Sequence, residues 1–292
     1  MTSTQQEELI ERAKILTEAL PYISRYRGKT IVIKYGGNAM NDANVMRTIM
    51  QDVATLKIVG VQPVLVHGGG PDISALLKRL AIPSRFENGL RVTDEAAMDA
   101  VQMALMKRNK DVTAALGTLD VKAIGLCGQD NGLIEVDKFG DESGTDYGYV
   151  GKIVNINTEV IETLLKKDYI PVIATVGVDK QGRAYNVNAD TAAGAIGGSL
   201  RAEKLLYLTD IDGIRENEND PHSLIAETDA THLREMIEDG RIHGGMVPKA
   251  LSCIDAIERG MQNVLILNGT IPHSILLELF TDSGIGTMVV NK

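Results

Sequence analysis

The sequence of 292 residues is poor in aromatic residues and cysteine. It contains no Trp, three Phe, eight Tyr and two Cys. Cys127 and Cys253 form no CxxC motif and no Cys/His cluster, so neither a disulfide framework nor a structural zinc site is expected. With so few aromatics the core must be mostly aliphatic, which is typical of Val, Ile and Leu strands that lie between helices.

Long apolar runs and an excess of positive charge are also missing. No run approaches the roughly 18 residues of a membrane span, and the acidic, polar N-terminus is unlike a signal peptide. A cytoplasmic protein without a membrane partner is therefore expected. The chain has 39 Asp and Glu against 30 Lys and Arg, a net charge of −9. Binding to nucleic acid needs a basic surface, so no nucleic-acid partner is expected.

Strand-like and helix-like segments alternate along the chain, after a first helix that we expect to end near Pro21. Strands are predicted at 30–34, 63–67, 123–126, 170–176, 204–208 and 264–267. Helices are predicted at 5–20, 43–59, 72–80, 94–116, 159–167, 191–200, 233–238 and 250–258. The long helix is expected to break near 109–111, and residues 128–152 are expected to form hairpins or loops. This alternation predicts an α/β fold, a three-layer αβα sandwich with a mostly parallel central sheet.

Two predicted strands end in glycine-rich turns. Lys34 closes the first strand and precedes Gly36 and Gly37, and His67 closes the second and precedes three glycines. Glycine lets backbone amides approach an anion, and ligands of parallel sheets bind at the carboxyl ends of the strands. Neither turn matches GxxxxGK[ST] or GxGxxG, which weakens a P-loop or dinucleotide interpretation. A tight turn with Lys34 in solvent and a flexible turn after His67 remain the alternatives, and His67 itself is predicted to be a hydrogen-bonded structural histidine.

Three further stretches carry charged or amide side chains. Arg91 follows a glycine turn, and a guanidinium is the usual clamp for a carboxylate, although a lone arginine is more often a surface charge. Asn186, Asn188 and Asp190 alternate along an extended stretch and are expected to point to one side; turn capping is the alternative. Lys249 follows another glycine pair. Two lysines, glycine-rich turns and an acid form the set that phosphoryl transfer needs.

The order of these motifs, KxGG, HGGG, NGLRVT, NxNAD, LTDxxGI and GGMxPK, resembles the amino acid kinase superfamily over residues 22–292. Within it the resemblance is closest to the acetylglutamate kinase family, whose members phosphorylate the side-chain carboxylate of N-acetyl-L-glutamate in arginine synthesis. The resemblance implies ATP and N-acetyl-L-glutamate as substrates, with Mg²⁺ held mainly by phosphate oxygens rather than by a metal site in the protein. It also implies an N-lobe at 25–200 for the acceptor and for dimerisation, and a C-lobe at 201–292 for ATP and an effector.

The resemblance also implies roles for individual residues. The catalytic set is Lys34, Lys249 and Asp190, with Asp190 organising both lysines. The acceptor would be bound by Gly69, Gly70, Arg91 and Asn186. The nucleotide would be bound by Gly36, Gly37, Thr209, Asp210 and Gly245.

The two ends of the chain resemble the arginine-inhibited members of the family. An N-terminal helix at 1–24 would link dimers into a hexamer, and L-arginine would act as effector. The residues implied at that site are Tyr22, Lys204, His273, Glu278 and Gly286. A C-terminal helix at 276–280 that is simply packed in the core is the structural alternative.

Other functions remain open at this point. The same residues would serve a kinase for a longer acylated amino acid of the aminoadipate type. A non-catalytic sensor of arginine or nucleotide is a third hypothesis, although intact Lys34, Asp190 and Lys249 speak against it. A nicotinamide oxidoreductase is disfavoured because GxGxxG is missing.

Overall fold

The computed structural model spans residues 1–292, and we describe all of them except 1–2, 38–41, 141–143, 218–219, 221 and 283. The helices are α1 (Ser3–Tyr26), α2 (Ala43–Ile58), α3 (Gly70–Arg79), α4 (Glu95–Gly117), α5 (Glu159–Lys166), α6 (Ala189–Ser199), α7 (Ala230–Glu238), α8 (Met246–Glu258) and α9 (Ser274–Phe280), with a 3₁₀ turn at Asp130–Gly132. The strands are β1 (Thr30–Tyr35), β2 (Gln62–His67), β3 (Arg85–Glu87), β4 (Leu90–Val92), β5 (Ala123–Cys127), β6 (Ile134–Lys138), β7 (Gly151–Ile156), β8 (Ile170–Ala174), β9 (Val176–Val178), β10 (Ala184–Asn186), β11 (Lys204–Thr209), β12 (Glu227–Asp229), β13 (Asn263–Asn268) and β14 (Thr287–Val290).

The central sheet has eight strands in the order β12-β14-β13-β11-β1-β2-β8-β5. Every neighbouring pair is parallel except β13 and β14. A four-stranded sheet (β10-β9-β6-β7) and the β3–β4 hairpin complete the strands of the described residues. The predicted mostly parallel sheet is confirmed, and the expected hairpin region is the antiparallel pair β6–β7.

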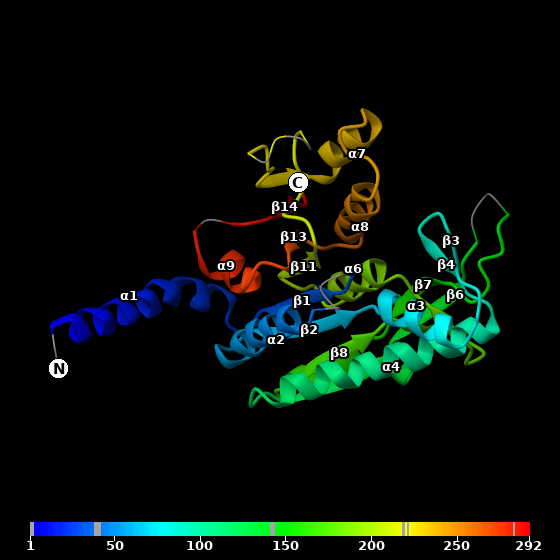
Figure 1. Ribbon diagram of the computed structural model, residues 1–292, viewed down its shortest axis with the longest axis horizontal. Helices are drawn as coiled ribbons and strands as arrows, with labels where there is room; N and C mark the ends of the chain where they lie inside the picture. The colour runs from blue at the N-terminus through cyan, green and yellow to red at the C-terminus, as the bar shows by residue number, and fades with distance from the viewer. Residues whose placement is uncertain (1–2, 38–41, 141–143, 218–219, 221, 283) are drawn as a thin grey trace.

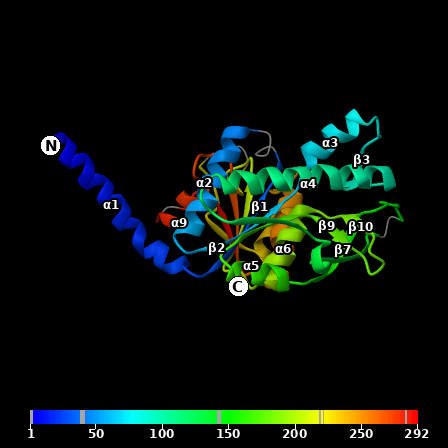
Figure 2. The same cartoon turned by 90° about the horizontal axis from the view of Figure 1, so that it is seen from below.

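Side-chain alternation in β1 explains the layers. Val32 packs with residues of α6 and α8 on one face, whereas Ile31 and Ile33 pack with residues of α2 and α9 on the other. Successive side chains of a strand point to opposite faces, so a strand that is apolar at every position is covered on both sides. The two views show α2 and α4 on one side of the sheet and α5 and α6 on the other (Figures 1 and 2). The predicted three-layer sandwich is confirmed.

Helix α1 projects from the body of the molecule (Figures 1 and 2). It does not end near Pro21 as expected but continues to Tyr26. A proline inside a helix leaves the carbonyl four residues earlier without a donor. Here that carbonyl belongs to Thr17, which is exposed, so water can satisfy it. Beyond the proline, buried Tyr26 anchors the helix on the body.

The predicted break in α4 near 109–111 is wrong. Asn109 is buried, and its side-chain amide bonds to partners on β2, β5 and β8 rather than competing for the helix backbone. On the exposed side, Lys107 pairs with Asp111 at 2.7 Å. Polar residues that find tertiary partners no longer favour a break, because their side chains do not compete with the helix's own hydrogen bonds.

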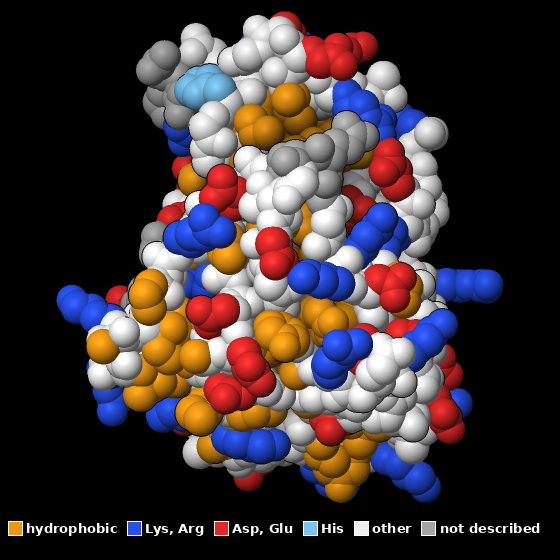
Figure 3. Space-filling model, turned by 90° about the vertical axis from the view of Figure 1, so that its right-hand side faces the viewer, with side chains coloured by type: hydrophobic (Ala, Val, Ile, Leu, Met, Phe, Trp, Pro, Cys, Tyr) orange, Lys and Arg blue, Asp and Glu red, His pale blue; other side chains and the backbone are white. Residues whose placement is uncertain are grey.

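The surface of the described residues carries both signs of charge. On the face at the α7 and β3–β4 end, Lys and Arg side chains are interspersed with Asp and Glu, and no broad basic area is visible (Figure 3). Within the described residues, no helix combines the length and the apolar character that a membrane crossing demands.

Candidate active site

The end of β1 brings Lys34 to the first turn of α6. Lys34 is two residues beyond Val32 and therefore shares the face of the sheet that α6 covers. Its ammonium lies 2.8 Å from the carboxylate of Asp190, and the Lys34 side chain is only 14% exposed. Gly36 leaves room for it, because a Cβ at that position would lie 3.0 Å from the ammonium nitrogen. Lys34 is thus an ion-paired, mostly buried cation rather than a solvated one.

A second cation completes this cavity from the other side. Lys249 in the first turn of α8 lies 3.3 Å from Asp210, which follows β11. In this structure each lysine pairs with its own carboxylate, and Asp190 lines the same cavity as both lysines, so its organising role for both stays a prediction. The cavity measures about 150 Å³. It is lined by Lys34, Gly36, Gly37, Asp190, Tyr207, Leu208, Thr209, Asp210, Lys249, Ser252 and Ile266.

Residues 186–190 do not form one extended stretch with three side chains on the same side. Strand β10 ends at Asn186, and Asn188 is the N-cap of α6, accepting bonds from the amides of Asp190 and Thr191 at 2.9 and 3.0 Å. Capping chemistry therefore explains Asn188. Asp190 lies inside the helix, where its carboxylate is also favoured by the helix N-terminus.

A second cavity, of about 190 Å³, lies beside the first and is reached by Asn188 and Ala189, the residues just before Asp190. It contains the predicted acceptor residues Gly69, Gly70, Arg91 and Asn186, together with Gly68, Ile73, Phe86, Gly89, Leu90, Leu105, Val150, Thr175, Val187, Asn188 and Ala189. The amide of Asn186 donates to the hydroxyl of Thr93 at 3.3 Å.

Arg91 is the charged group of this cavity and is only 6% exposed. Its guanidinium donates to the hydroxyls of Ser84 and Ser74, the latter at 2.7 Å, and to the Gly70 carbonyl at 3.3 Å. It also stacks 4.5 Å over the ring of Phe86. Burial lowers the pKa of Arg91. All of these partners are neutral, and among the described residues no carboxylate lies within ion-pair distance. A buried cation with neutral partners favours an anionic ligand.

The predicted structural role of His67 is confirmed by its surroundings. The imidazole is fully buried, with Nδ1 2.8 Å from the Gly68 carbonyl and Nε2 3.1 Å from the amide nitrogen of Asn109. Burial lowers the pKa of His67 to about 4, so it is neutral near pH 7.

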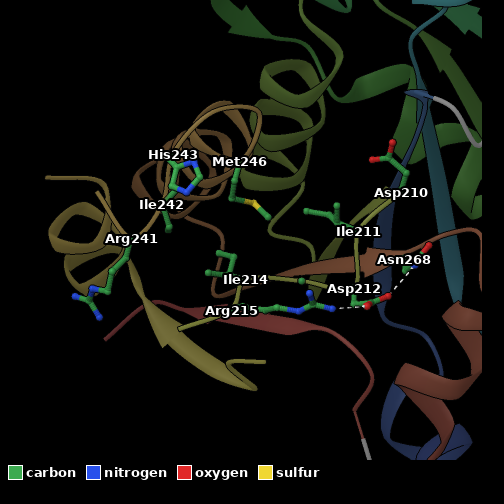
Figure 4. Close-up of a pocket in the computed structure, with 11 residues that line it drawn as sticks. Asp210, Ile211, Asp212, Ile214, Arg215, Arg241, Ile242, His243, Met246 and Asn268 are labelled. Carbon is green, nitrogen blue, oxygen red and sulfur yellow. Dashed lines mark hydrogen bonds and ion pairs between the residues drawn. The ribbon is translucent and has the colours of Figure 1, made fainter. Parts of the chain in front are cut away.

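A third cavity, of about 330 Å³, opens next to the lysine-lined one and shares Asp210 with it (Figure 4). The side chain of Ile211, just after β11, and that of Met246, at the start of α8, both point into this cavity. The guanidinium of Arg241 points away from it. Asp212 accepts from Asn268 at 2.8 Å and from Arg215 at 3.1 Å. This cavity is partly apolar with polar groups at its rim, a character typical of sites for small ligands. Gly245 precedes α8, between two lining residues, His243 and Met246.

The predicted effector residues fall into two places. Lys204 is buried, and its ammonium nitrogen lies 6.0 Å from the centre of the Tyr26 ring. Burial lowers the pKa of Lys204, and the charge of nearby Glu278 opposes this in part. Glu278 accepts from the Ile285 amide at 2.8 Å, and the Tyr22 hydroxyl donates to Asp282. Gly286 is packed so tightly that a Cβ would lie 2.2 Å from the Ile266 carbonyl. His273, at the start of α9, instead bonds Asp52 of α2 at 2.6 Å.

Sequence reasoning missed several residues of these sites. Ser74, Ser84 and Phe86 hold the Arg91 guanidinium, and Tyr207 lines the lysine cavity. For Ser74 the usable signal was helical spacing, because this residue lies one turn after Gly70. For Tyr207 the signal was strand register, because Tyr207 pairs with Lys34 on the neighbouring strand. Asp72 and Arg108 form a bidentate pair at 2.7 Å that no local pattern indicated.

In the part of the chain that is described, no three His, Cys, Asp or Glu side chains gather closely enough to hold a metal ion.

Comparison with known proteins agrees with this geometry. A family model described as the amino acid kinase family matches residues 29–268. The acetylglutamate kinase of Thermoanaerobacter pseudethanolicus is 52% identical over 281 residues, which cover 96% of this chain and 93% of the relative. The acetylglutamate kinase of Methanocaldococcus jannaschii is 48% identical, with 97% of both chains covered.

Solved structures show the same fold. N-acetylglutamate synthase of Neisseria gonorrhoeae, in complex with coenzyme A and N-acetyl-glutamate, superposes with a TM-score of 0.85 at 28% identity. The match covers 96% of this chain but only 63% of the synthase. The same synthase with coenzyme A and L-arginine gives a TM-score of 0.80 at 26% identity, covering 96% of this chain and 65% of the synthase. With a matching family model and relatives about half identical over nearly its whole length, the chain belongs to the amino acid kinase family and, within it, to the acetylglutamate kinases.

Proposed function

We propose that this protein transfers the γ-phosphoryl group of ATP to the side-chain carboxylate of N-acetyl-L-glutamate, in arginine biosynthesis. The observation that carries the proposal is the order of three adjoining cavities. A partly apolar cavity shares Asp210 with a cavity lined by two lysines, and that one adjoins, through residues 188–190, a cavity with the buried cation Arg91. The nucleoside, the transferring phosphoryl group and the acceptor would occupy them in that order.

The proposed division of the chain into two lobes is supported by the same order of cavities. The residues of the Arg91 cavity lie between 68 and 189, and those of the partly apolar cavity between 210 and 268. We therefore assign acceptor binding to an N-lobe at 25–200 and nucleotide binding to a C-lobe at 201–292. Gly36, Gly37, Thr209, Asp210 and Gly245 would face the nucleotide.

The reaction needs no protein base. The acceptor carboxylate is ionised near pH 7, since a glutamate-type carboxyl has a pKa of about 4.3. One of its oxygens forms a bond to the γ-phosphorus while the bond from that phosphorus to the β,γ-bridging oxygen breaks, and ADP leaves with the electron pair. The main barrier is electrostatic repulsion, because the anionic acceptor carboxylate must approach the anionic γ-phosphoryl group of ATP. Lys34 and Lys249 would neutralise charge on the phosphoryl group in flight, and Asp190 and Asp210 would hold their ammonium groups in place.

The ends of the acceptor would be fixed by separate groups. Arg91 would clamp the α-carboxylate, for which its buried position and neutral partners suit it. Asn186 would bind the acetylated amide, and Gly69 and Gly70 the reacting carboxylate. Mg²⁺, bound to the ATP phosphates, would supply further charge neutralisation. The carboxylates of the lysine cavity are paired with lysines, so they fit a metal held by phosphate oxygens better than one caged by the protein.

The test is ATP-dependent formation of an acyl phosphate from N-acetyl-L-glutamate, trapped as the hydroxamate by hydroxylamine. Hydroxamate formation supports the proposal. N-acetyl-L-aminoadipate as the better acceptor would replace it with the longer-chain kinase. No product with either acceptor would favour a sensor without catalysis.

We also propose feedback inhibition by L-arginine at the junction of α1, α9 and β11. Lys204 lies close to Tyr26 of α1 and is influenced by the charge of Glu278 on α9, while Tyr22 of α1 bonds Asp282 just after α9. Glu278, which accepts from Ile285 next to Gly286, would pair with the cationic groups of arginine. His273 would act from the far end of α9. The N-acetylglutamate synthase that binds L-arginine supports this by analogy. Adding L-arginine should lower hydroxamate formation, and Glu278→Gln should weaken that inhibition without lowering the uninhibited rate.

Helix α1 supports a proposal on assembly. Leu9, Ile10, Ile15, Leu16 and Leu20 are 49–70% exposed on a helix that projects from the body. An apolar face of this kind is typical of contact with another subunit. We propose that α1 joins dimers into a hexamer.

A further inference from the structure

A buried polar network lies directly behind the glycine turn of the acceptor cavity. It joins His67 at the end of β2 with Asn109 in the middle of α4. The Asn109 amide nitrogen also lies 2.9 Å from the Val172 carbonyl of β8 and 3.2 Å from the Leu126 carbonyl of β5. Gly125 makes room for the amide, since a Cβ there would lie 1.9 Å from the Asn109 oxygen. The proposed chemistry uses neither Asn109 nor His67.

The partners of Asn109 fix the orientation of its amide. Backbone carbonyls only accept hydrogen bonds, so the atom that faces Leu126 and Val172 must be the NH₂ group. An amide nitrogen does not accept, so His67 presents a lone pair to it at Nε2. The proton of the neutral imidazole is therefore on Nδ1.

The other ring nitrogen leads to the same tautomer. Nδ1 lies 2.8 Å from the Gly68 carbonyl, which can only accept, so Nδ1 must carry the hydrogen. Both contacts are thus satisfied by the same protonation state of His67. Its burial, which lowers its pKa to about 4, keeps the ring neutral across the neutral pH range.

The direction of the Gly68 carbonyl decides what the turn offers to a ligand. The described chain has no cis peptide bond, so the Gly69 N–H points opposite to the Gly68 carbonyl. With that carbonyl held by His67, the N–H is directed away from the network. Among the described residues the Gly69 N–H has no hydrogen-bond acceptor. Glycine at 68 and 69 would allow the peptide to turn over, which would present a carbonyl oxygen instead.

We propose that Asn109 is a positioning residue of the acceptor cavity: it selects the Nδ1-protonated form of His67, which holds the Gly68 carbonyl and so directs the Gly69 N–H to an acceptor carboxylate. The carboxylate's identity rests on the proposed function. The rest of α4 braces the same turn. The Leu105 side chain lies against Gly69, where a Cβ would be 2.8 Å away, and Arg108 pairs with Asp72 in α3. Helices α3 and α4 lie side by side in both views (Figures 1 and 2).

The tautomer can be measured without any substrate. Long-range ¹H–¹⁵N correlation spectra of the ligand-free protein distinguish a protonated from an unprotonated ring nitrogen. We expect His67 to be protonated on Nδ1 alone in the wild type and to populate both tautomers in Asn109→Leu. Protonation of Nε2 in the wild type would overturn the proposal. Because no turnover is involved, this result is independent of whether N-acetyl-L-glutamate is the acceptor.

Kinetics separate positioning from a merely structural role. The amide of an asparagine at 67 reaches about as far as Nδ1 and can still donate to the Gly68 carbonyl, whereas that of a glutamine reaches the place of Nε2. His67→Gln and Asn109→Leu should raise the KM for the acceptor about three- to tenfold, the loss of one hydrogen bond, with the KM for ATP unchanged. His67→Asn should stay within about twofold of the wild type.

Thr113→Val is the matched control on α4. Its hydroxyl bonds the Asn109 main-chain carbonyl at 2.7 Å, so it disturbs the same helix turn but not the network, and the acceptor KM should not change. Equal acceptor KM values for His67→Gln and His67→Asn would overturn the proposal, even if Asn109→Leu failed to fold. Failure of the wild type to phosphorylate N-acetyl-L-glutamate would reject the proposed function, while the spectra would still decide the tautomer.

Discussion

The Lys34 ammonium and the Asp190 carboxylate lie 2.8 Å apart where β1 meets the first turn of α6. The two residues are 156 positions apart in the chain, and only the packing of α6 on the sheet brings them together. A mostly buried cation in this place has its position fixed before any ligand arrives. Fixed positive charge costs no reorganisation during a reaction, which is how electrostatic stabilisation of a transition state gains its effect.

Removal of either cavity lysine should therefore act on turnover. We expect Lys34→Ala and Lys249→Ala each to lower kcat about 10²- to 10³-fold with smaller changes in KM, because the charge matters most in the transition state. The hydroxamate assay measures both constants. Lys29→Ala, which removes an exposed ion pair with Glu203 at 3.3 Å, is the control and should keep full activity. Unchanged turnover in both cavity variants would reject the mechanism.

Arg91 should act on acceptor binding. Arg91→Lys keeps the charge but loses the fork that reaches Ser74 and Ser84 together, so it cannot present the same geometry to a carboxylate. We expect the KM for the acceptor to rise about ten- to a hundredfold, with the KM for ATP unchanged. Arg85→Lys, at an exposed position of the same hairpin, is the matched control. A larger effect on ATP than on the acceptor would contradict the assignment.

His67 should make stability depend on pH. Its pKa is about 4 in the folded protein, against about 6.5 when unfolded. Between these values the unfolded chain binds more protons, so the contribution of His67 is complete above pH 6.5 and is lost as pH falls toward 4. From pH 7 to pH 5 we expect the free energy of unfolding to fall about 2 kcal/mol more in the wild type than in His67→Gln. Urea titrations at the two pH values measure this, and parallel behaviour of the two proteins would refute it.

The exposed face of α1 should control assembly. Leu16 is 70% exposed, and in Leu16→Glu we expect the proposed hexamer to separate into dimers, since a charge buried at an interface without a partner is costly. Light scattering coupled to size-exclusion chromatography gives the mass. Thr17→Glu, next to it on the helix, tests the charge alone. A wild-type protein that is already dimeric would exclude the proposed role of α1.

The sequence was informative where a pattern is local. Strand alternation and glycine turns led to Lys34, and a helix start led to Asp190, because these residues follow directly from the ends of elements. The partner of Lys249 was not predictable, because Lys249 lies on α8 and Asp210 follows the separate strand β11. The break expected in α4 failed for the same reason: Asn109 is polar in its local context, but its partners lie on three other elements. The continuation of α1 through Pro21 likewise depends on Tyr26 being buried in the body.

The position of β1 in the middle of the sheet has a consequence for synthesis of the protein. Its neighbour β2 follows within about thirty residues, but its other neighbour, β11, is made only after residue 203. Thr209, the last residue of β11, is synthesised 174 residues after Tyr35, the last residue of β1, which at about 5–20 residues per second is a delay of roughly 9 to 35 s. During that time one edge of the future central strand has no partner, and unpaired edges invite pairing with other chains. The nascent chain therefore carries an exposed strand edge along β1 that the finished enzyme does not have, because β11 covers it.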